Sequence, residues 1–282
     1  MALAIAAAVL HAIFGAMQKG KYDPFIIRGA MDISYCAMAL PLALIFTPIP
    51  DARGWLVLGG AWGIHTIYKY LQAAAYQRGA YTVVYPVVRG TGPLFAVIGA
   101  WLLFDESFTL GQWAGVGVLL AGIYGLAAYN YRHITQGRDT LVMALGIAVV
   151  TGLFVALYTT YDAFGIRAVN DPFEFLLWFF VVDGWFIPIV AFLRWRKAPN
   201  RPAPGPLMLR GWLGGFVAFA SFGAIMLATR LDKVGEAAVL RETSTVFAAL
   251  IGWLFLKETV GPQRAVLMGL IALGAVIVEF AA

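Results

Sequence analysis

The second half of this chain repeats its first half. Residues 89–106 (RGTGPLFAVIGAWLLFDE) return without a gap as residues 241–258 (RETSTVFAALIGWLFLKE), 152 positions later. The same offset pairs Gly122 with Gly274. Two copies of one unit are expected to form two similar halves. In a strongly apolar chain, such a duplication is typical of membrane proteins whose halves meet at a central site.

The composition places most of the chain in a lipid bilayer. Of the 282 residues, 61% are hydrophobic and only 12% are charged, whereas an ordinary soluble domain has roughly 25% charged residues. A soluble surface would need far more charge, and a bilayer removes that need. The formal net charge of +5 comes from Lys and Arg gathered in loops, as membrane orientation requires, so we expect no nucleic-acid partner.

Ten apolar stretches are long enough to cross a bilayer, which takes about 20 residues for a helix. Helices are expected because an open chain in lipid must satisfy its own backbone hydrogen bonds. The predicted spans are residues 2–17, 25–47, 55–76, 82–104, 110–129, 141–161, 173–192, 207–229, 237–256 and 265–280. The predicted fold class is an all-α integral membrane protein with ten transmembrane helices.

The ten spans divide into two sets of five. We predict a first five-helix repeat at 1–129, a linker at 130–140 and a second five-helix repeat at 141–282. Because five is odd, the two repeats are expected to insert with opposite orientations, as an inverted repeat. The loops after the odd-numbered spans hold twelve Lys and Arg residues, and the other loops hold four. Positive charge marks the cytoplasmic side, so both termini are predicted outside, in a multi-pass protein of a bacterial inner membrane.

The repeated segment resembles that of a known family. Pro93 to Glu106 (PLFAVIGAWLLFDE) and Thr245 to Glu258 (TVFAALIGWLFLKE) are each followed by a glycine-spaced helix. This pattern is similar to the drug/metabolite transporter superfamily, in its ten-helix branch with two EamA-like domains. The resemblance implies that the first, third and fourth helices of each repeat line a central cavity, while the fifth packs at the periphery. Thr245 replaces the proline that the family often has, so the ninth span is expected to be straighter than the fourth.

The third span carries a polar stripe. His65, Lys69 and Gln72 are spaced by four and three residues, which places them on one helical face, and Trp62 is expected to join them. An ionisable group inside a membrane is a functional candidate because its burial in hydrocarbon is costly. We therefore predict that these four residues bind a substrate. The alternative is that Lys69 reaches the membrane edge and that His65 only satisfies a backbone carbonyl.

Two arginines occupy equivalent positions in the two halves. Arg89 follows Tyr85 by one turn in the fourth span, and Arg241 lies at the matching place in the ninth. Two buried guanidinium groups suit the binding of one anionic group by bidentate hydrogen bonds. We predict that Tyr85, Arg89 and Arg241 line the substrate site. In the alternative interpretation, each arginine pairs with an acid such as Glu242 and only locks the helices together.

Three acids lie within predicted spans. Tyr158 precedes Asp162 by one turn in the sixth span, Asp183 lies in the seventh, and Glu242 follows Arg241 in the ninth. We predict that Tyr158 forms a wall of the site. The three acids are predicted either to be counter-ions, with Asp162 as a partner of Arg89 or Lys69, or to couple transport to protons.

Two further features are expected to be structural. Glu106 and Glu258 are predicted to cap helix ends or to pair locally. The glycine pair Gly59 and Gly63 suits close helix packing. The same is expected of a run in the fifth span, namely Gly111, Gly115, Gly117 and Gly122.

The chain lacks the sequence signatures of enzymes. It contains no HExxH, GxSxG or CxxC motif, and its three histidines lack the spacing of a metal site. We therefore expect no enzyme activity, no cofactor and no metal. The predicted function is secondary transport of a small polar metabolite, an amino acid or related organic anion, by a monomer or homodimer. The alternatives are a lipid-headgroup flippase or a multidrug or cation exporter of the same superfamily; a channel or structural subunit ranks last because the repeat has no evident use there.

Overall fold

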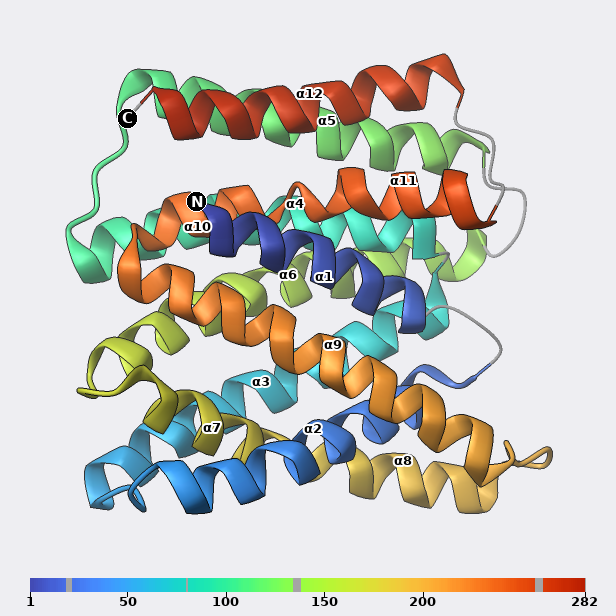
Figure 1. The fold of residues 1–282 in the computed structure, drawn as a ribbon. Helices are drawn as coiled ribbons and strands as arrows, with labels where there is room; N and C mark the ends of the chain where they lie inside the picture. Colours follow the sequence, from blue (N-terminus) through green and yellow to red (C-terminus); the bar gives the residue numbers. More distant parts are fainter. Residues whose placement is uncertain (19–21, 80, 134–137, 257–260, 282) are drawn as a thin grey trace.

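The computed structural model describes residues 1–18, 22–79, 81–133, 138–256 and 261–281, and the regular secondary structure of this part of the chain is all helical (Figure 1). Its segments are α1 (Ala2–Gln18), α2 (Pro24–Phe46), α3 (Ala52–Arg78), α4 (Tyr81–Phe104), α5 (Leu110–His133), α6 (Arg138–Arg167), α7 (Pro172–Asp183), α8 (Phe186–Lys197), α9 (Pro204–Leu231), α10 (Val234–Arg241), α11 (Ser244–Leu256) and α12 (Pro262–Phe280). The helices α5 and α6 extend into the expected linker, to His133 and from Arg138.

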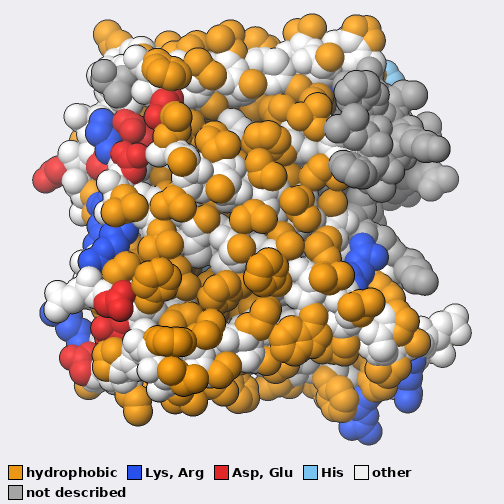
Figure 2. All heavy atoms as spheres, in the orientation of Figure 1, with side chains coloured by type: hydrophobic (Ala, Val, Ile, Leu, Met, Phe, Trp, Pro, Cys, Tyr) orange, Lys and Arg blue, Asp and Glu red, His pale blue; other side chains and the backbone are white. Residues whose placement is uncertain are grey.

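The outer surface is that of a multi-pass membrane protein. Among the described residues, seven stretches are long and apolar enough to span a bilayer: Pro24–Phe46, Val83–Phe104, Leu110–His133, Thr140–Arg167, Pro172–Lys197, Pro204–Leu231 and Pro262–Phe280. Figure 2 shows hydrophobic side chains over the broad middle of one face, with charged side chains gathered at its two edges. This is the distribution that a bilayer requires, with polar groups at the ends of the helices.

Local sequence explains where several helices begin. The Asp23 carboxylate accepts hydrogen bonds from the backbone N–H groups of Phe25 (2.8 Å) and Ile26 (3.2 Å), with Pro24 in the first turn of α2. Asp51 accepts from the Gly54 N–H at the start of α3 (2.7 Å). A side-chain oxygen at this position satisfies donors that have no partner within the helix.

Two of the predicted spans are broken near their middles. The seventh is divided into α7 and α8 at Gly184 and Trp185, and the ninth into α10 and α11 at Glu242 and Thr243. At the second break, the N–H of Thr243 bonds to the Leu240 carbonyl (3.1 Å) and that of Glu242 to the Val239 carbonyl (3.0 Å). These bonds span three residues instead of four, so the helix tightens locally into a 3₁₀ turn.

The expectation of a straighter ninth span is therefore wrong. The helix that lacks the proline is the one that breaks, whereas α4 continues through both Pro86 and Pro93. The buried residues Arg241 and Glu242 (2% and 0% exposed) stand at the break itself. Glu242 pairs with Arg89 of α4, and Arg241 donates to Thr159 of α6, so contacts with other helices are concentrated where this helix is irregular.

The fifth helix of each half packs at one edge of the molecule, as the resemblance implies. The helices α5 and α12 lie against each other, away from α2, α7 and α8 (Figure 1). Their contact is close because it is built on glycines: a Cβ atom at position 274 would lie 2.6 Å from the Gly115 carbonyl oxygen. Gly111, Gly115 and Gly122 all lie in this contact. Small residues at such positions let two helices approach closely.

Other glycines do not pack as expected. Among the described residues, no atom lies within 4 Å of a Cβ built at any of three predicted positions, so the prediction is wrong for Gly59, Gly63 and Gly117. The tight contact of the second half lies instead between α9 and α2. There, a Cβ at Gly211 would lie 2.7 Å from the Ala30 carbonyl oxygen, and one at Gly215 would lie 2.8 Å from that of Met31.

Glu106 caps a helix end, which confirms the prediction. Its carboxylate accepts hydrogen bonds from the N–H groups of Val234 (2.8 Å) and Gly235 (3.0 Å), the first two residues of α10. A carboxylate here also complements the positive end of the helix dipole. The end of α4 is thereby tied to the start of α10. Glu258 lies outside the described residues.

The centre of the molecule lies between α1, α3, α4, α6, α7, α9 and α10. The helix α3 packs on α6 and α7, α4 packs on α6 and α10, and α1 packs on α9, α10 and α11. Both helix breaks lie on helices of this group, α7 and α10. The charged side chains of the predicted spans therefore converge here.

Candidate functional site

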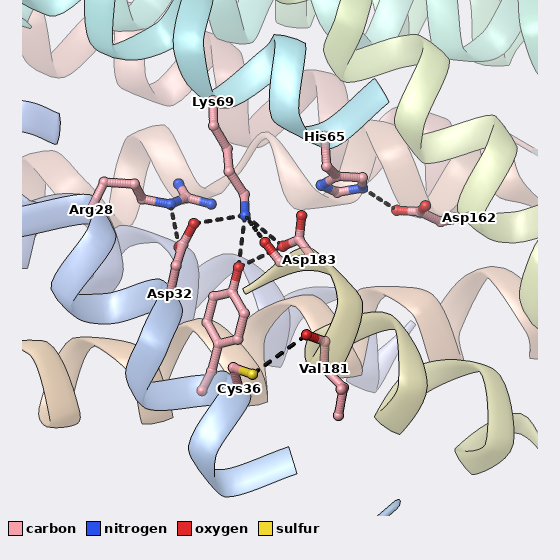
Figure 3. Close-up of polar contacts among 9 residues, drawn as sticks. Arg28, Asp32, Cys36, His65, Lys69, Asp162, Val181 and Asp183 are labelled. Carbon is pink, nitrogen blue, oxygen red and sulfur yellow. Dashed lines mark hydrogen bonds and ion pairs between the residues drawn. The ribbon is translucent and has the colours of Figure 1, made fainter. Parts of the chain in front are cut away.

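Lys69 is the centre of a first buried cluster (Figure 3). Its ammonium group donates to Asp32 Oδ2 (2.7 Å), Asp183 Oδ2 (2.6 Å) and the Tyr35 hydroxyl (2.7 Å). It also donates to the backbone carbonyl of Asp183 (3.1 Å), the last residue of α7. Lys69 is 1% exposed, so it does not reach the membrane edge. The cluster joins α2, α3 and the break between α7 and α8.

The charges of this first cluster balance. Arg28 Nε donates to Asp32 Oδ1 (2.8 Å), and the Tyr35 hydroxyl donates to Asp183 Oδ2 (2.5 Å). Two cations therefore face two carboxylates, and all four charged side chains are buried. Burial of charges without loss of stability requires this kind of pairing and hydrogen bonding.

His65 and Asp162 form a second polar contact beside Lys69 (Figure 3). His65 Nε2 lies 2.8 Å from Asp162 Oδ2, and both residues are buried. The other carboxylate oxygen, Asp162 Oδ1, has no hydrogen-bond partner among the described residues. The suggested pairing of Asp162 with Arg89 or Lys69 is wrong, because the helix α6 turns Asp162 toward α3 and Lys69 is held by Asp183 and Asp32.

A third cluster surrounds the break between α10 and α11. Glu242 Oε2 lies 2.7 Å from Arg89 Nε, and Glu242 Oε1 lies 3.8 Å from Arg241 Nε. Arg89 also donates to the Ser244 hydroxyl (3.1 Å). Arg241 donates to the Thr159 hydroxyl on α6 (3.3 Å). The two arginines from matching positions therefore share one carboxylate.

This third cluster has an excess of positive charge and of donors. Two guanidinium groups face the single carboxylate of Glu242, and all three residues are buried. Four donor groups have no hydrogen-bond partner among the described residues, namely the Nε atoms of Arg89 and Arg241 and the hydroxyls of Tyr158 and Thr245, and both Glu242 oxygens also lack one. Buried donors without partners are costly. The cluster is thus electrostatically suited to an additional anion.

The aromatic ring of Tyr158 connects the second and third clusters. The centroid of the Tyr158 ring lies 4.5 Å from the centroid of the His65 ring. The guanidinium carbon of Arg241 lies 5.7 Å from the same Tyr158 centroid. Phe222 lies within 6.3 Å of both the Tyr158 and His65 rings. The predicted wall residue Tyr158 therefore stands between the acid Asp162 and the arginines.

Three further predicted residues differ in their placement. Gln72 is buried and donates to the Tyr68 hydroxyl (2.7 Å), and Tyr85 lies 3.5 Å from the Ser244 hydroxyl. Trp62 is 37% exposed and is absent from the buried face of α3, so its assignment to the stripe is wrong. The buried face of α3 includes Ala61 in its place.

Several members of these clusters are not among the predicted site residues. Tyr35, Tyr68 and Ser244 each contact a predicted residue. A signal exists for the first: Arg28, Asp32 and Tyr35 follow each other by four and three residues in an apolar helix, which places them on one face. Tyr68 and Ser244 have no such signal. Among the described residues, no group of three acids, histidines or cysteines is placed to hold a metal ion.

Comparison with known proteins decides the family. The family model described as the EamA-like transporter family matches residues 1–128 and 142–280. The chain belongs to the EamA-like transporter family. This is the family that the sequence resemblance implied, within the drug/metabolite transporter superfamily.

Individual relatives of this EamA-like transporter are distant. The uncharacterized transporter sll1319 of Synechocystis sp. is 21% identical over 170 residues, which are 60% of this chain and 50% of that protein. The chain thus spans half the length of this curated relative. A solved crystal structure is similar with a TM-score of 0.78 and 17% identity, covering 99% of this chain and 98% of that one. At this identity, the likeness concerns the fold alone.

Proposed function

We propose that this EamA-like transporter carries a small organic anion, most favourably an amino acid, across a bacterial inner membrane by alternating access. The observation that carries the proposal is the shared carboxylate of Glu242 between Arg89 and Arg241, which leaves one positive charge uncompensated within that cluster. Guanidinium groups bind carboxylates through directed, charge-assisted hydrogen bonds. The anionic group of the substrate would lie here, near the helix break.

The chemistry on the other side of Tyr158 favours an amino acid over a simple acid. Asp162 Oδ1 is a buried acceptor without a hydrogen-bond partner among the described residues, and it suits an ammonium group. Asp162 lies on α6 close to Tyr158 and Thr159. The Thr159 hydroxyl accepts a hydrogen bond from Arg241. A molecule with an anionic and a cationic end would satisfy both clusters at once.

For the architecture, we propose ten spans arranged as two inverted repeats, 1–129 and 141–282, joined by 130–140. The helix contacts support it: α3 packs on α6 as α9 packs on α1, and α2 packs on α9 as α7 packs on α3. Each of these contacts in one half therefore has a counterpart between the helices at the matching positions of the repeat. Figure 1 shows both termini at the same end of the helices, which suits an even number of crossings. By the loop charges, that end lies outside.

Arg89 provides the first test. Purified protein is heated with a ligand panel of amino acids, organic acids, phosphorylated metabolites, lipid headgroups and cationic drugs. A ligand at a hundredfold its dissociation constant stabilises by about 2.7 kcal/mol. We expect stabilisation by a carboxylate-bearing ligand, with affinity at least tenfold weaker in the Arg89→Lys variant, because an ammonium group cannot replace the planar guanidinium fork.

Other results of this panel would point elsewhere. An Arg89→Lys protein with wild-type affinity would overturn the anion site. Stabilisation only by lipid headgroups or by lipophilic cations would support the flippase or the drug-exporter alternative. An Arg194→Lys variant serves as control, because Arg194 lies at the surface of α8, and its ligand affinity should not change.

We also propose that the pair of Asp162 and His65 couples transport to protons. The groups around Asp162 that titrate or carry charge are His65, Tyr158, Tyr161, Asp183 and Arg241. The Asp162→Asn substitution removes the charge of the carboxylate. The asparagine side chain has nearly the same shape and can still form a hydrogen bond with His65. Uptake into proteoliposomes is expected to lose most of its dependence on pH. Retention of the full pH dependence would exclude this role of Asp162.

A further inference from the structure

The carboxylate of Glu242 lies where the proposed substrate anion would have to bind. Its two oxygens face different arginines, Oε2 at 2.7 Å from Arg89 Nε and Oε1 at 3.8 Å from Arg241 Nε. Glu242 is 0% exposed. No second carboxylate contacts either arginine among the described residues, so Glu242 and a bound carboxylate would use the same two cations.

Glu242 holds this position without good hydrogen-bond geometry. Neither of its oxygens, nor the Nε atom of Arg89 or Arg241, forms a directed hydrogen bond among the described residues. A carboxylate matched to one guanidinium group forms two parallel hydrogen bonds instead. Glu242 therefore neutralises charge but leaves donor capacity for an incoming anion.

The two arginines have contacts that do not depend on Glu242. Arg89 donates to the Ser244 hydroxyl (3.1 Å) and lies 3.5 Å from His11 Nε2 on α1. Arg241 donates to Thr159 and lies over the Tyr158 ring. When Glu242 leaves, both guanidinium groups stay oriented by these contacts. A preoriented pair of donors is what an anion site needs.

Glu242 itself belongs to the least regular stretch of its span. It follows the last residue of α10, in the 3₁₀ turn that separates α10 from α11. A 3₁₀ stretch within a helix often marks a hinge. Movement of this one side chain therefore bears directly on the angle between the two halves of the ninth span.

We propose that Glu242 is a tethered competitor of the transported anion. The carboxylate of the substrate displaces Glu242 from Arg89 and Arg241, and the return of Glu242 expels the substrate. This proposal rests on the proposed function, because it assumes that the arginines bind the anion. Its consequence is unusual for a buried acid: removal of the carboxylate is expected to strengthen the binding of an anion.

The test uses acetate as a bare carboxylate and acetamide as its neutral match. Thermal unfolding of the full-length protein is followed against the concentration of each, with chloride holding the ionic strength constant. The apparent dissociation constant of acetate is expected to be at least tenfold lower in Glu242→Gln than in the wild type. Acetamide is expected to stabilise neither. Glu174→Gln, an acid of α7 outside the clusters, should behave as the wild type.

The outcomes separate this inference from the proposed function. If Glu242→Gln binds acetate no more tightly than the wild type, while anion binding still requires Arg89, then competition is excluded and the anion site stands. If anion binding is independent of Arg89, the proposed function fails. Should Glu242→Gln fold only in acetate, that dependence supports the inference. Glu242→Asp, which shortens the tether, is expected to have intermediate affinity, and an affinity below the wild type would contradict competition.

Discussion

Replacement of Lys69 by methionine is expected to lower the free energy of unfolding by about 3–5 kcal/mol, the usual cost of removing one partner from a buried ion pair. Methionine keeps much of the length and apolar character of the lysine stem. It leaves Asp32 and Asp183 with only Arg28 to balance them, so one buried carboxylate becomes uncompensated. Unfolding in mixed micelles would measure the loss.

The balance of charges in this cluster predicts that a second substitution restores stability. In the double variant Lys69→Met with Asp183→Asn, the remaining pair of Arg28 and Asp32 is neutral, and Tyr35 retains a polar neighbour. Asp183→Asn alone also leaves a buried excess charge, of the opposite sign. We therefore expect each single variant to be less stable than the double, and the interaction energy of the mutant cycle is the readout. Additive effects of the two changes would mean that charge balance does not hold this cluster together.

Gly274→Ala is expected to destabilise the protein by about 1–3 kcal/mol, because a methyl group is forced into a filled contact. A Cβ at this position lies 2.6 Å from the Gly115 carbonyl oxygen and meets the backbone of Leu119, neither of which can rotate away. The helices α5 and α12 would have to separate. The midpoint of thermal unfolding measures the effect.

Gly269→Ala on the same helix is the matched control. Nothing lies within 4 Å of a Cβ built at this position. In a helix interior, alanine is more favourable than glycine by about 0.5–1 kcal/mol, so this variant is expected to be slightly more stable than the wild type. Equal effects of the two substitutions would show that the contact between α5 and α12 is not close.

The sequence predicted which residues would be buried in the membrane better than it predicted their partners. The spacing of His65, Lys69 and Gln72 predicted one buried face of α3, since helical periodicity depends only on local geometry. Which acid pairs with which cation depends on the rotation of helices far apart in the sequence. Asp162 therefore pairs with His65 instead of with Arg89 or Lys69, and the two acids that contact Lys69 lie on α2 and α7.

The helix breaks were the other feature that the sequence did not reveal. The segment after Glu242 is more apolar than the segment before it, but no sequence signal for a helix break lies between them, and proline, the usual signal, occurs in the unbroken α4. The break is instead associated with buried charge at Arg241 and Glu242, whose contacts come from other helices. The residue that matches Glu242 in the first half is Gly90, so comparison of the two repeats does not predict the break either.

The glycine contact between α9 and α2 and the ionic contact between α3 and α7 are equivalent under the repeat, yet they differ in kind. Backbones that touch through glycines slide past each other with few directional bonds to break, whereas the Lys69 contacts must be broken one by one. If the halves exchange conformations as proposed, separation at the α3–α7 contact has a higher barrier than separation at the α2–α9 contact. Opening of the side that is closed by Lys69 is then expected to be the slower of the two movements.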